Sequence, residues 1–298
     1  MTQVDKASRK PCIALMGEFS AGKSTLANLL IGSDPLPVQV IATQLPPVWI
    51  SHGDAPAFRV DLDGNQFAID LDNLAEAPLD ETAYIKIFCD EELLLQCDLL
   101  DMPGISDPNM SSEVWQRMIS KADGVLWCSH ATQAWRQSEA AVWASLPPDL
   151  YQRSLLLLTR IDKITSERDR QKLIRRVRAE TEGLFLQCLP ISLLQATAEQ
   201  DDYDVWLKSG AEDFAKHLVD LLHSLSEDGA VGPEGQSLPE AAKPLRISGL
   251  VAPDSAPAPP PAPAPQTAAP QIMPRRVRLS PSPQDRACAR DGAPGRPS

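Results

Sequence analysis

Gly17-Glu-Phe-Ser-Ala-Gly-Lys-Ser24 is the stretch of sequence that decides the fold. It matches the pattern G-x-x-x-x-G-K-[S/T], in which a glycine-rich loop joins a buried strand to a helix. The surroundings agree, because the apolar run Ile13–Met16 precedes the loop and a helical pattern over Ser24–Leu30 follows it. In such a loop, backbone N–H groups and the helix N-terminus face a phosphate. The sequence therefore predicts a phosphate-binding loop.

Individual side chains of this loop have expected roles. The two glycines allow close approach to phosphate oxygens. Lys23 is placed to neutralise the β- and γ-phosphates, and the Ser24 hydroxyl to ligate Mg²⁺. The residues of this loop expected to bind nucleotide are Gly17, Ser20, Ala21, Gly22, Lys23 and Ser24.

Apolar runs alternate with helical patterns outward from this loop. Residues 58–70 read as a hairpin around Asp63-Gly64-Asn65, and 84–88 and 93–100 as a second pair of strands. Further strands are expected at 124–128, 155–158 and 184–191, and helices at 112–121, 138–146, 167–182 and 211–225. This order predicts the α/β class, with a mostly parallel central sheet and helices on both faces. Ligands of such sheets lie beyond the carboxyl ends of the strands.

Two segments fall outside this alternation. Residues 33–47 carry four prolines and should form an extended loop. Residues 229–298 hold more than half of the 28 prolines and no aromatic side chain, which predicts a disordered Pro/Ala-rich tail. A docking ligand for a proline-binding or acidic protein partner is the alternative interpretation of the tail. We therefore expect an extension at 1–9, one domain at 10–228 and the tail.

Composition excludes several classes of function. The net charge of −12 repels nucleic acid and anionic lipid, so any bound polyanion must occupy a local pocket. The six cysteines include no C-x-x-C pair, and as free core thiols they suit a reducing cytoplasm. No apolar run is long enough to span a bilayer, although peripheral contact with a membrane through a partner stays compatible with the sequence.

The loop alone does not identify the ligand, because ATPases, kinases and GTPases all use such a loop. Two later motifs narrow the choice. Asp101-Met-Pro-Gly104 follows an apolar run, so its carboxylate can reach Mg²⁺ and its Gly104 N–H can bind the γ-phosphate. Thr159-Arg-Ile-Asp162 follows the run at 155–158. The Asp162 carboxylate can accept from guanine N1–H and the 2-amino group together, whereas adenine offers neither donor. A helix cap is the alternative role for Asp162.

At these positions the chain resembles the dynamin-type G domains, and among them the bacterial dynamin-like GTPases. Gly17–Thr25 is similar to their phosphate-binding loop, Val38–Pro47 to their first switch and Asp101–Gly104 to their second. Thr159–Asp162 resembles their base-reading loop, with threonine in place of the more usual asparagine. The resemblance covers about Lys10–Leu225 and implies a P-loop GTPase fold that binds GTP or GDP with Mg²⁺.

The resemblance implies further site residues. Thr43 matches the switch threonine that completes Mg²⁺ coordination and contacts the γ-phosphate, and Thr25 supports the serine before it. Ser192 falls where a loop touches the guanine O6. A plain loop residue at Thr43 and a helix cap at Ser192 are the alternatives. The expected catalytic residues are Ser20, Lys23, Thr43 and Gly104; the expected metal ligands are Ser24, Thr43 and Asp101; the remaining nucleotide contacts are Thr25, Thr159, Arg160, Asp162 and Ser192.

Departures from the family pattern bear on catalysis. Arg160 replaces the usual lysine of the base-reading loop. Ile105, after Gly104, and Phe19, where eukaryotic dynamins have glutamine, cannot orient a water molecule. The family counterpart of Ser20 helps to hold a monovalent cation, K⁺ or Na⁺, when two G domains meet face to face. The resemblance thus implies a homodimer across the nucleotide face, or a partner's side chain, and slow unassisted turnover.

Three functions compete at this point. The first is a switch that hydrolyses GTP, and the second is a GTP-dependent assembly or binding module with little or no hydrolysis. A P-loop kinase is the third, but it leaves Asp162 without a role. The expected disordered tail would replace the helical stalk through which dynamins remodel membranes, so membrane fission is not inferred. Arg136 lies near the expected nucleotide rim and is a candidate for a charge that acts across a dimer.

Overall fold

The computed structural model describes residues 9–32, 45–106, 112–198 and 203–229. Most of the extended loop expected at 33–47, with Thr43, lies outside the described residues. The expected tail also lies outside them, apart from Gly229 at the end of the last helix.

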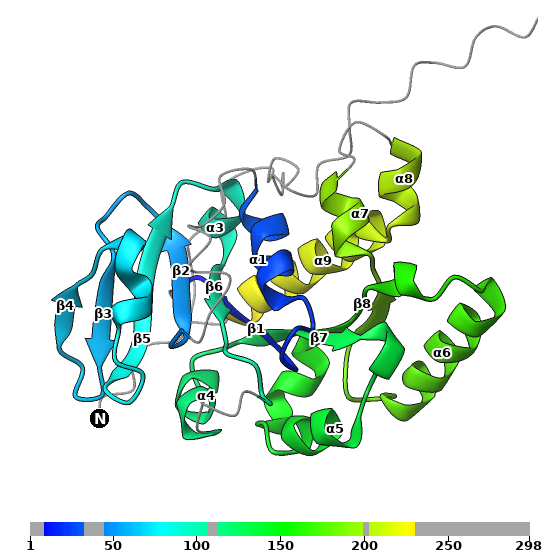
Figure 1. The fold of residues 1–298 in the computed structure, drawn as a ribbon, viewed down its shortest axis with the longest axis horizontal. Helices are drawn as coiled ribbons and strands as arrows, with labels where there is room; N and C mark the ends of the chain where they lie inside the picture. Colours follow the sequence, from blue (N-terminus) through cyan, green and yellow to red (C-terminus); the bar gives the residue numbers. More distant parts are fainter. Residues whose placement is uncertain (1–8, 33–44, 107–111, 199–202, 230–298) are drawn as a thin grey trace, which may run out of the picture. The chain divides into compact units, whose positions relative to one another are not determined.

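The strands of the described residues form one sheet in the order β4-β3-β5-β2-β6-β1-β7-β8-β9 (Figure 1). Neighbours among β6, β1, β7, β8 and β9 are parallel, as are β5 and β2. Strand β2 runs antiparallel to β6, and β3 antiparallel to both β5 and β4. The predicted mostly parallel sheet is confirmed. The strands are β1 (Cys12–Gly17), β2 (Val48–His52), β3 (Phe58–Asp61), β4 (Gln66–Ala68), β5 (Thr82–Cys89), β6 (Asp98–Asp101), β7 (Gly124–His130), β8 (Ser154–Thr159) and β9 (Gln187–Pro190).

Helices lie on both faces of the sheet, with α1, α7 and α9 on one side of the central strands and α4 and α5 on the other (Figure 1). The α-helices are α1 (Lys23–Ile31), α3 (Glu92–Gln96), α4 (Ser112–Ile119), α5 (Gln137–Ala144), α6 (Glu167–Glu180), α7 (Leu193–Ala198), α8 (Tyr203–Lys208) and α9 (Ala211–Gly229). Four short 3₁₀ segments are described: η2 (Leu71–Glu76), η3 (Ala131–Gln133), η4 (Pro148–Arg153) and η5 (Ile161–Lys163). No described helix is long and apolar enough to cross a membrane.

Strand β1 divides the hydrophobic core into two layers, because successive side chains of a strand point to opposite faces. Ile13 and Leu15 belong to the cluster packed by α1, α7 and α9. Cys12, Ala14 and Met16 belong to the cluster packed by α4, α5 and α6. Every side chain of β1 is therefore buried, and the glycine-rich loop that follows starts from a rigid central strand.

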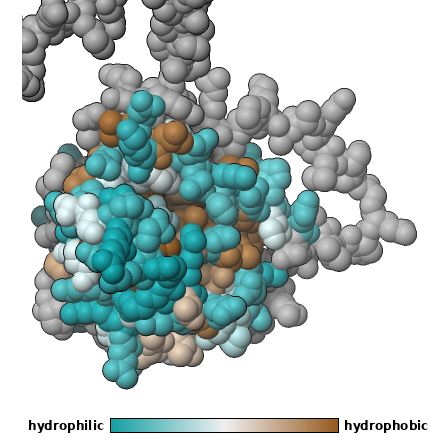
Figure 2. Space-filling view, turned by 90° about the vertical axis from the view of Figure 1, so that its right-hand side faces the viewer, coloured by the Kyte–Doolittle hydropathy of each residue, from teal (hydrophilic) through white to brown (hydrophobic). Residues whose placement is uncertain are grey.

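The charged helix expected at 167–182 is α6, and it is amphipathic as predicted. Ile174 and Val177 are buried against the sheet, and Ser166 caps the helix by accepting a hydrogen bond from the Asp169 N–H at 3.3 Å. Figure 2 views the side of the molecule that carries α6, where most of the visible surface is hydrophilic.

The strand expected at 93–100 is wrong in its first half. Residues Glu92–Gln96 form α3, and only Asp98–Asp101 form β6. The two segments expected to pair are not neighbours either, because β2 lies between β5 and β6. Leu93 and Leu94 are buried from a helix while Leu95 is 53% exposed. A short run of leucines carries no period that separates helix from strand, which is why the pattern misled.

An aromatic cluster fills the core beneath α5. The Trp143 ring contacts those of Trp127 and Phe185, with centroids 5.4 and 4.1 Å apart. Trp135 contacts Trp127 and Phe185 at 6.3 and 5.4 Å. Glu139 is buried among these rings and accepts a hydrogen bond from the Trp127 Nε1–H at 3.0 Å. The tryptophans are thus core residues, and they fix the position of the N-terminus of α5.

Candidate functional site

The glycine-rich loop leaves the end of β1 beside the neighbouring strand β7, where Gly17 pairs with Cys128. Gly17 has a φ of 143°, and a Cβ atom there would lie 2.1 Å from the carbonyl oxygen of Cys128. Gly22 precedes the first residue of α1 with a φ of 96°, and its α-carbon faces the side chain of Leu193. Only glycine fits the first position without displacing β7, so the course of the loop is set by two residues of the motif.

Lys23 is the first residue of α1 and is buried. Its Nζ donates to the carbonyl oxygens of Gly17 at 3.2 Å and Glu18 at 3.0 Å, so the ammonium group lies over the loop. Ser24 and Thr25 follow in the first turn of the helix and are half-buried. One cation and two hydroxyl residues are thereby gathered at the N-terminus of α1, where anions are stabilised.

Two hydrogen bonds join the end of β8 to the glycine-rich loop. The Thr159 hydroxyl donates to the carbonyl oxygen of Ala21 at 2.6 Å. The Arg160 guanidinium donates to the carbonyl oxygen of Ser20 at 3.1 Å, and Arg160 adopts a left-handed backbone with φ 55°. These bonds hold side by side two loops that lie far apart in the sequence. Arg160, which stands where the family usually has lysine, makes one of them.

Asp162 is held by a buried serine. The Ser192 hydroxyl donates to Asp162 Oδ1 at 2.7 Å, and Ser192 is completely buried. Helix α6 is capped by Ser166, so Asp162 does not have the capping role that was the alternative. Ser192 also accepts from the Gln195 N–H at 3.4 Å, which is the contact of a helix cap, the alternative role for this residue. The contact fixes one carboxylate oxygen at the loop beyond β8.

Asp101 is the last residue of β6 and carries an orphaned polar atom. Its Oδ1 is buried and has no hydrogen-bond partner among the described residues. Burial raises the pKa of the carboxyl to about 6, and the charge of Lys23 opposes this rise. A buried oxygen without a donor fits a hard cation such as Mg²⁺. No group of three His, Cys, Asp or Glu side chains capable of holding a metal occurs in the described part.

The segment after Asp101 lies against the glycine-rich loop. The Ile105 N–H donates to the carbonyl oxygen of Gly17 at 3.2 Å. A Cβ atom on Gly104 would lie 3.0 Å from the backbone N and Cα of Phe19, so the two backbones are in close approach. The Phe19 side chain is 67% exposed. Any shift of residues 104 and 105 would therefore displace the glycine-rich loop.

The structure brings together most residues that the sequence nominates, from Gly17–Thr25, Asp101–Gly104, Thr159–Asp162 and Ser192. Thr43 is the exception, because it lies outside the described residues.

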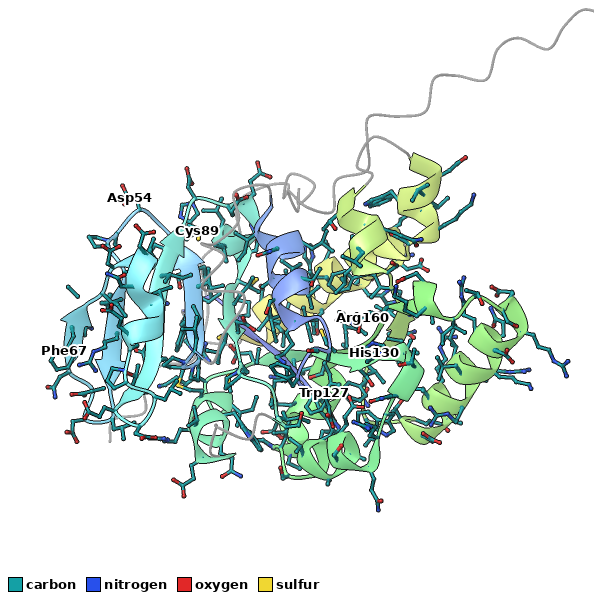
Figure 3. All side chains as sticks on the ribbon, in the orientation of Figure 1. Asp54, Phe67, Cys89, Trp127, His130 and Arg160 are labelled. Carbon is teal, nitrogen blue, oxygen red and sulfur yellow. The ribbon has the colours of Figure 1, made fainter. Side chains whose placement is uncertain are left out.

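The sequence pattern gave no role to two further neighbours. Glu18 accepts from the Ser138 hydroxyl at the start of α5 and approaches Arg136. His130, at the end of β7, lies near Arg160 (Figure 3), and its pKa is lowered by burial and then by the arginine charge. Glu18 is at an unspecified position of the glycine-rich motif and His130 belongs to no motif, so only the sheet order could have suggested these contacts.

A sequence profile described as the dynamin family matches residues 13–161. The chain belongs to the dynamin family. The matched part runs from β1 through Ile161, so it includes the glycine-rich loop and most of the base-reading loop. The chain is thus a dynamin-family GTPase domain, and the predicted family is confirmed.

Curated relatives of this dynamin-family chain are bacterial. Dynamin-like protein 2 of Campylobacter jejuni is 27% identical over 195 residues, which cover 63% of this chain and 32% of the relative. Isoniazid-induced protein IniC of Mycobacterium tuberculosis is 30% identical over 125 residues, covering 38% of this chain and 25% of the relative. The alignments therefore span about a third or less of the curated relatives.

A solved structure of a bacterial dynamin pair shares the fold. It superposes with a TM-score of 0.52 at 23% identity, covering 76% of this chain and 37% of the other. That pair is described as oligomerised and as sensing and tethering membranes over a long range. For the present chain the superposition establishes the dynamin-family fold.

Proposed function

We propose that this dynamin-family domain binds GTP and hydrolyses it to GDP and phosphate as a molecular switch. The observation that carries the proposal is the position of Asp162, which Ser192 orients at 2.7 Å beside a loop bonded to the glycine-rich loop. A nucleotide site must keep its base-binding end at a fixed distance from its phosphate-binding end. These hydrogen bonds hold the base-reading loop against the glycine-rich loop.

The base would be selected by the number of hydrogen-bond donors that it offers to the Asp162 carboxylate. Guanine presents N1–H and the 2-amino group to a carboxylate, whereas adenine would leave the Asp162 carboxylate without donors. The Ser192 hydroxyl holds Oδ1, which limits rotation of the carboxylate. Loss of hydrogen bonds to a charged group costs roughly 1.5–3 kcal/mol each, so discrimination of on the order of 100-fold or more is expected.

The phosphates would lie at the N-terminus of α1. There Lys23 neutralises charge, the loop N–H groups bind oxygens, and Thr43 and Gly104 sense the γ-phosphate. Ser24 and Asp101, with Thr43, would hold Mg²⁺, which fits the orphaned oxygen of Asp101. When bound, the metal neutralises charge between the β- and γ-phosphates. K⁺ or Na⁺ at Ser20 belongs to the same proposal.

Activation would come from a second G domain across the nucleotide face or from a protein partner. Phe19 lies in the glycine-rich loop and Ile105 beside it, and neither side chain can orient water by hydrogen bonding. In this proposal a cation or a partner's side chain supplies the group that orients the water.

A GTP-dependent assembly module with little hydrolysis is the second candidate. The exposure of Phe19 favours it, because an aromatic side chain 67% exposed in the middle of a phosphate-binding loop suits a contact with another molecule. In this alternative, GTP binding would order the contact surface, and the bound partner would be released after the nucleotide is exchanged.

The test measures GTP hydrolysis against protein concentration, in K⁺ and in Na⁺, for wild type and Lys23→Ala. We expect a rate per molecule that rises with concentration in wild type and is absent in Lys23→Ala. Lys172→Ala, an exposed change on α6, is the matched control. Tight GTP binding with no phosphate release at any concentration would select the assembly module. Preference for ATP, or no nucleotide binding, would refute both.

A further inference from the structure

The glycine-rich loop carries a negative charge of its own. Glu18 lies between Gly17 and Phe19, and its side chain is only 15% exposed. One carboxylate oxygen accepts from the Ser138 hydroxyl at 2.5 Å, and the other lies 3.7 Å from Nη1 of Arg136. A carboxylate so close to a phosphate site would repel the ligand unless its charge were neutralised.

Arg136 is held in place by a network independent of Glu18. Its backbone N–H donates to Glu139 Oε2 at 2.9 Å, which also accepts from the Ser129 hydroxyl at 3.0 Å. The Ser129 hydroxyl in turn accepts from the Trp135 N–H at 2.9 Å. Trp135 is buried with a φ of 54°, an unfavourable conformation for a large side chain that this network stabilises.

The network also places a second carboxylate, that of Glu139, near Glu18. Glu139 is buried, its pKa is raised by that burial, and the Glu18 charge adds to the rise. Two carboxylates therefore face the same turn, and the Arg136 guanidinium lies 3.7 Å from one of them, Glu18. The guanidinium is 52% exposed, so water reaches one side of it.

We propose that Arg136 is a positioning residue of the nucleotide site: it neutralises Glu18 within the same chain and holds that carboxylate away from the phosphates. The inference rests on the proposed GTP binding. It gives Arg136 a role inside its own domain, in contrast to the action across a dimer that the sequence suggested. The expected consequence is electrostatic, so it grows with the charge of the nucleotide and weakens with salt.

The test is a double-mutant cycle on the affinity for a non-hydrolysable GTP analogue. Arg136→Gln keeps a polar stem and removes the charge, and we expect it to weaken binding about fivefold at low salt. In a Glu18→Gln background the same change should weaken binding less than about twofold, because no carboxylate is left to neutralise. Arg136→Lys, which retains the charge, should restore most of the affinity.

Three further measurements make the result specific. The loss in Arg136→Gln should be larger for the GTP analogue than for GDP and should shrink at high salt. Arg175→Ala, an exposed change on α6, is the matched arginine control and should leave affinity unchanged. A thermal melt of each variant records its folding, and Arg136→Met, which also removes the charge, replaces Arg136→Gln in the cycle if the latter is unfolded.

The outcomes separate the two proposals. Equal losses from Arg136→Gln with and without Glu18, or no loss at all, would overturn the role of Arg136 while leaving GTP binding intact. Failure of the wild-type protein to bind guanine nucleotides would overturn the proposed function, and this inference with it.

Discussion

Asp162 and Ser192 come from the loops that follow two neighbouring parallel strands, β8 and β9. Because both strands end at the same edge of the sheet, a hydroxyl and a carboxylate 30 residues apart in the sequence meet at 2.7 Å. The serine is completely buried and therefore cannot exchange this partner for water. The hydrogen bond favours one orientation of the carboxylate, which the proposed recognition of a planar base would require.

Asp162→Asn should change the base preference. An amide offers a donor where guanine also has a donor, so we expect GTP affinity to fall on the order of 100-fold. Xanthine carries an acceptor at that position, and xanthosine triphosphate should bind the variant better than the wild type. Competition binding with GTP and xanthosine triphosphate measures the change in base preference. An unchanged preference for guanine would mean that the base lies elsewhere.

Asp101→Asn should alter the pH dependence of stability in the nucleotide-free, metal-free protein. Burial raises the pKa of Asp101 from 3.8 to about 6, so between these values the folded state keeps a proton that the unfolded state has lost. Stability contributed by this group therefore falls as pH rises through that window, by about 3 kcal/mol in total. Asparagine does not titrate, and the variant should lack this fall.

Urea unfolding of wild type and Asp101→Asn at several pH values isolates the effect as a difference between the two proteins. The difference in unfolding free energy should grow from about pH 4 to about pH 6 and then stay constant. Asp54→Asn, an exposed change, is the control. A difference that is the same at every pH would contradict the assignment of the raised pKa.

The junction of β1 with the glycine-rich loop depends on the neighbouring strand. Gly17 pairs with Cys128 of β7, and the missing side chain leaves room for that carbonyl oxygen. A side chain would have to move β1 away from β7, and both strands are buried on both faces. The packing of β1 against β7 therefore determines the position of the glycine-rich loop, together with the residues of the loop itself.

Gly17→Ala should destabilise the fold by about 3 kcal/mol or more, because the added Cβ would lie 2.1 Å from a backbone oxygen at a φ of 143°. Gly64→Ala is the matched control: its φ is also positive, at 91°, but nothing lies within 4 Å of the added Cβ. That change should cost about 1 kcal/mol. Denaturant midpoints compare the two, and equal losses would show that backbone conformation alone matters.

Elements with a long periodic pattern, or with a distinctive motif beside them, could be predicted from sequence. The amphipathic helix at 167–182 and the closing helix at 211–225 are observed, because burial repeats over enough residues to reveal the period. The short strand at 13–16 is observed too, and the glycine-rich motif directly after it was its signal. Helices α7 and α8, of six residues each, were not anticipated. The contact between Glu18 and Arg136 could not be foreseen either, since it depends on how α5 is seated on the aromatic cluster.

The whole described fold is built from residues before the Pro/Ala-rich segment. Both core clusters draw their members from Cys12 to Leu225, and α9 closes one of them with Phe214, Leu218 and Leu222. The proposed domain, 10–228, therefore contains both of these clusters and every strand of the described residues. That sheet order could not be derived from sequence, because β2 enters between β5 and β6 without any local signal.

A chain that ends at Gly229 should melt at the temperature of the full chain, within about 2 °C, and bind GTP with equal affinity. The reason is that no member of either cluster is removed. Differential scanning calorimetry on both chains tests this expectation. A chain that ends at Leu218 is the counterpart, because it removes Leu222 from the core and should be clearly less stable. Equal melting of all three chains would contradict this account of α9.

The aromatic cluster beneath α5 gives the molecule an optical property. Indole emission responds to nearby charge and to water, and Trp135 directly precedes the residue that contacts Glu18 of the glycine-rich loop. Trp127 and Trp143 lie within ring contact of one another, so excitation absorbed by one can pass to its neighbour. Any ligand that repositions Glu18 or Arg136 alters the field around these rings. Binding at the proposed nucleotide site should thus change the intrinsic fluorescence, so that no dye on protein or nucleotide is needed.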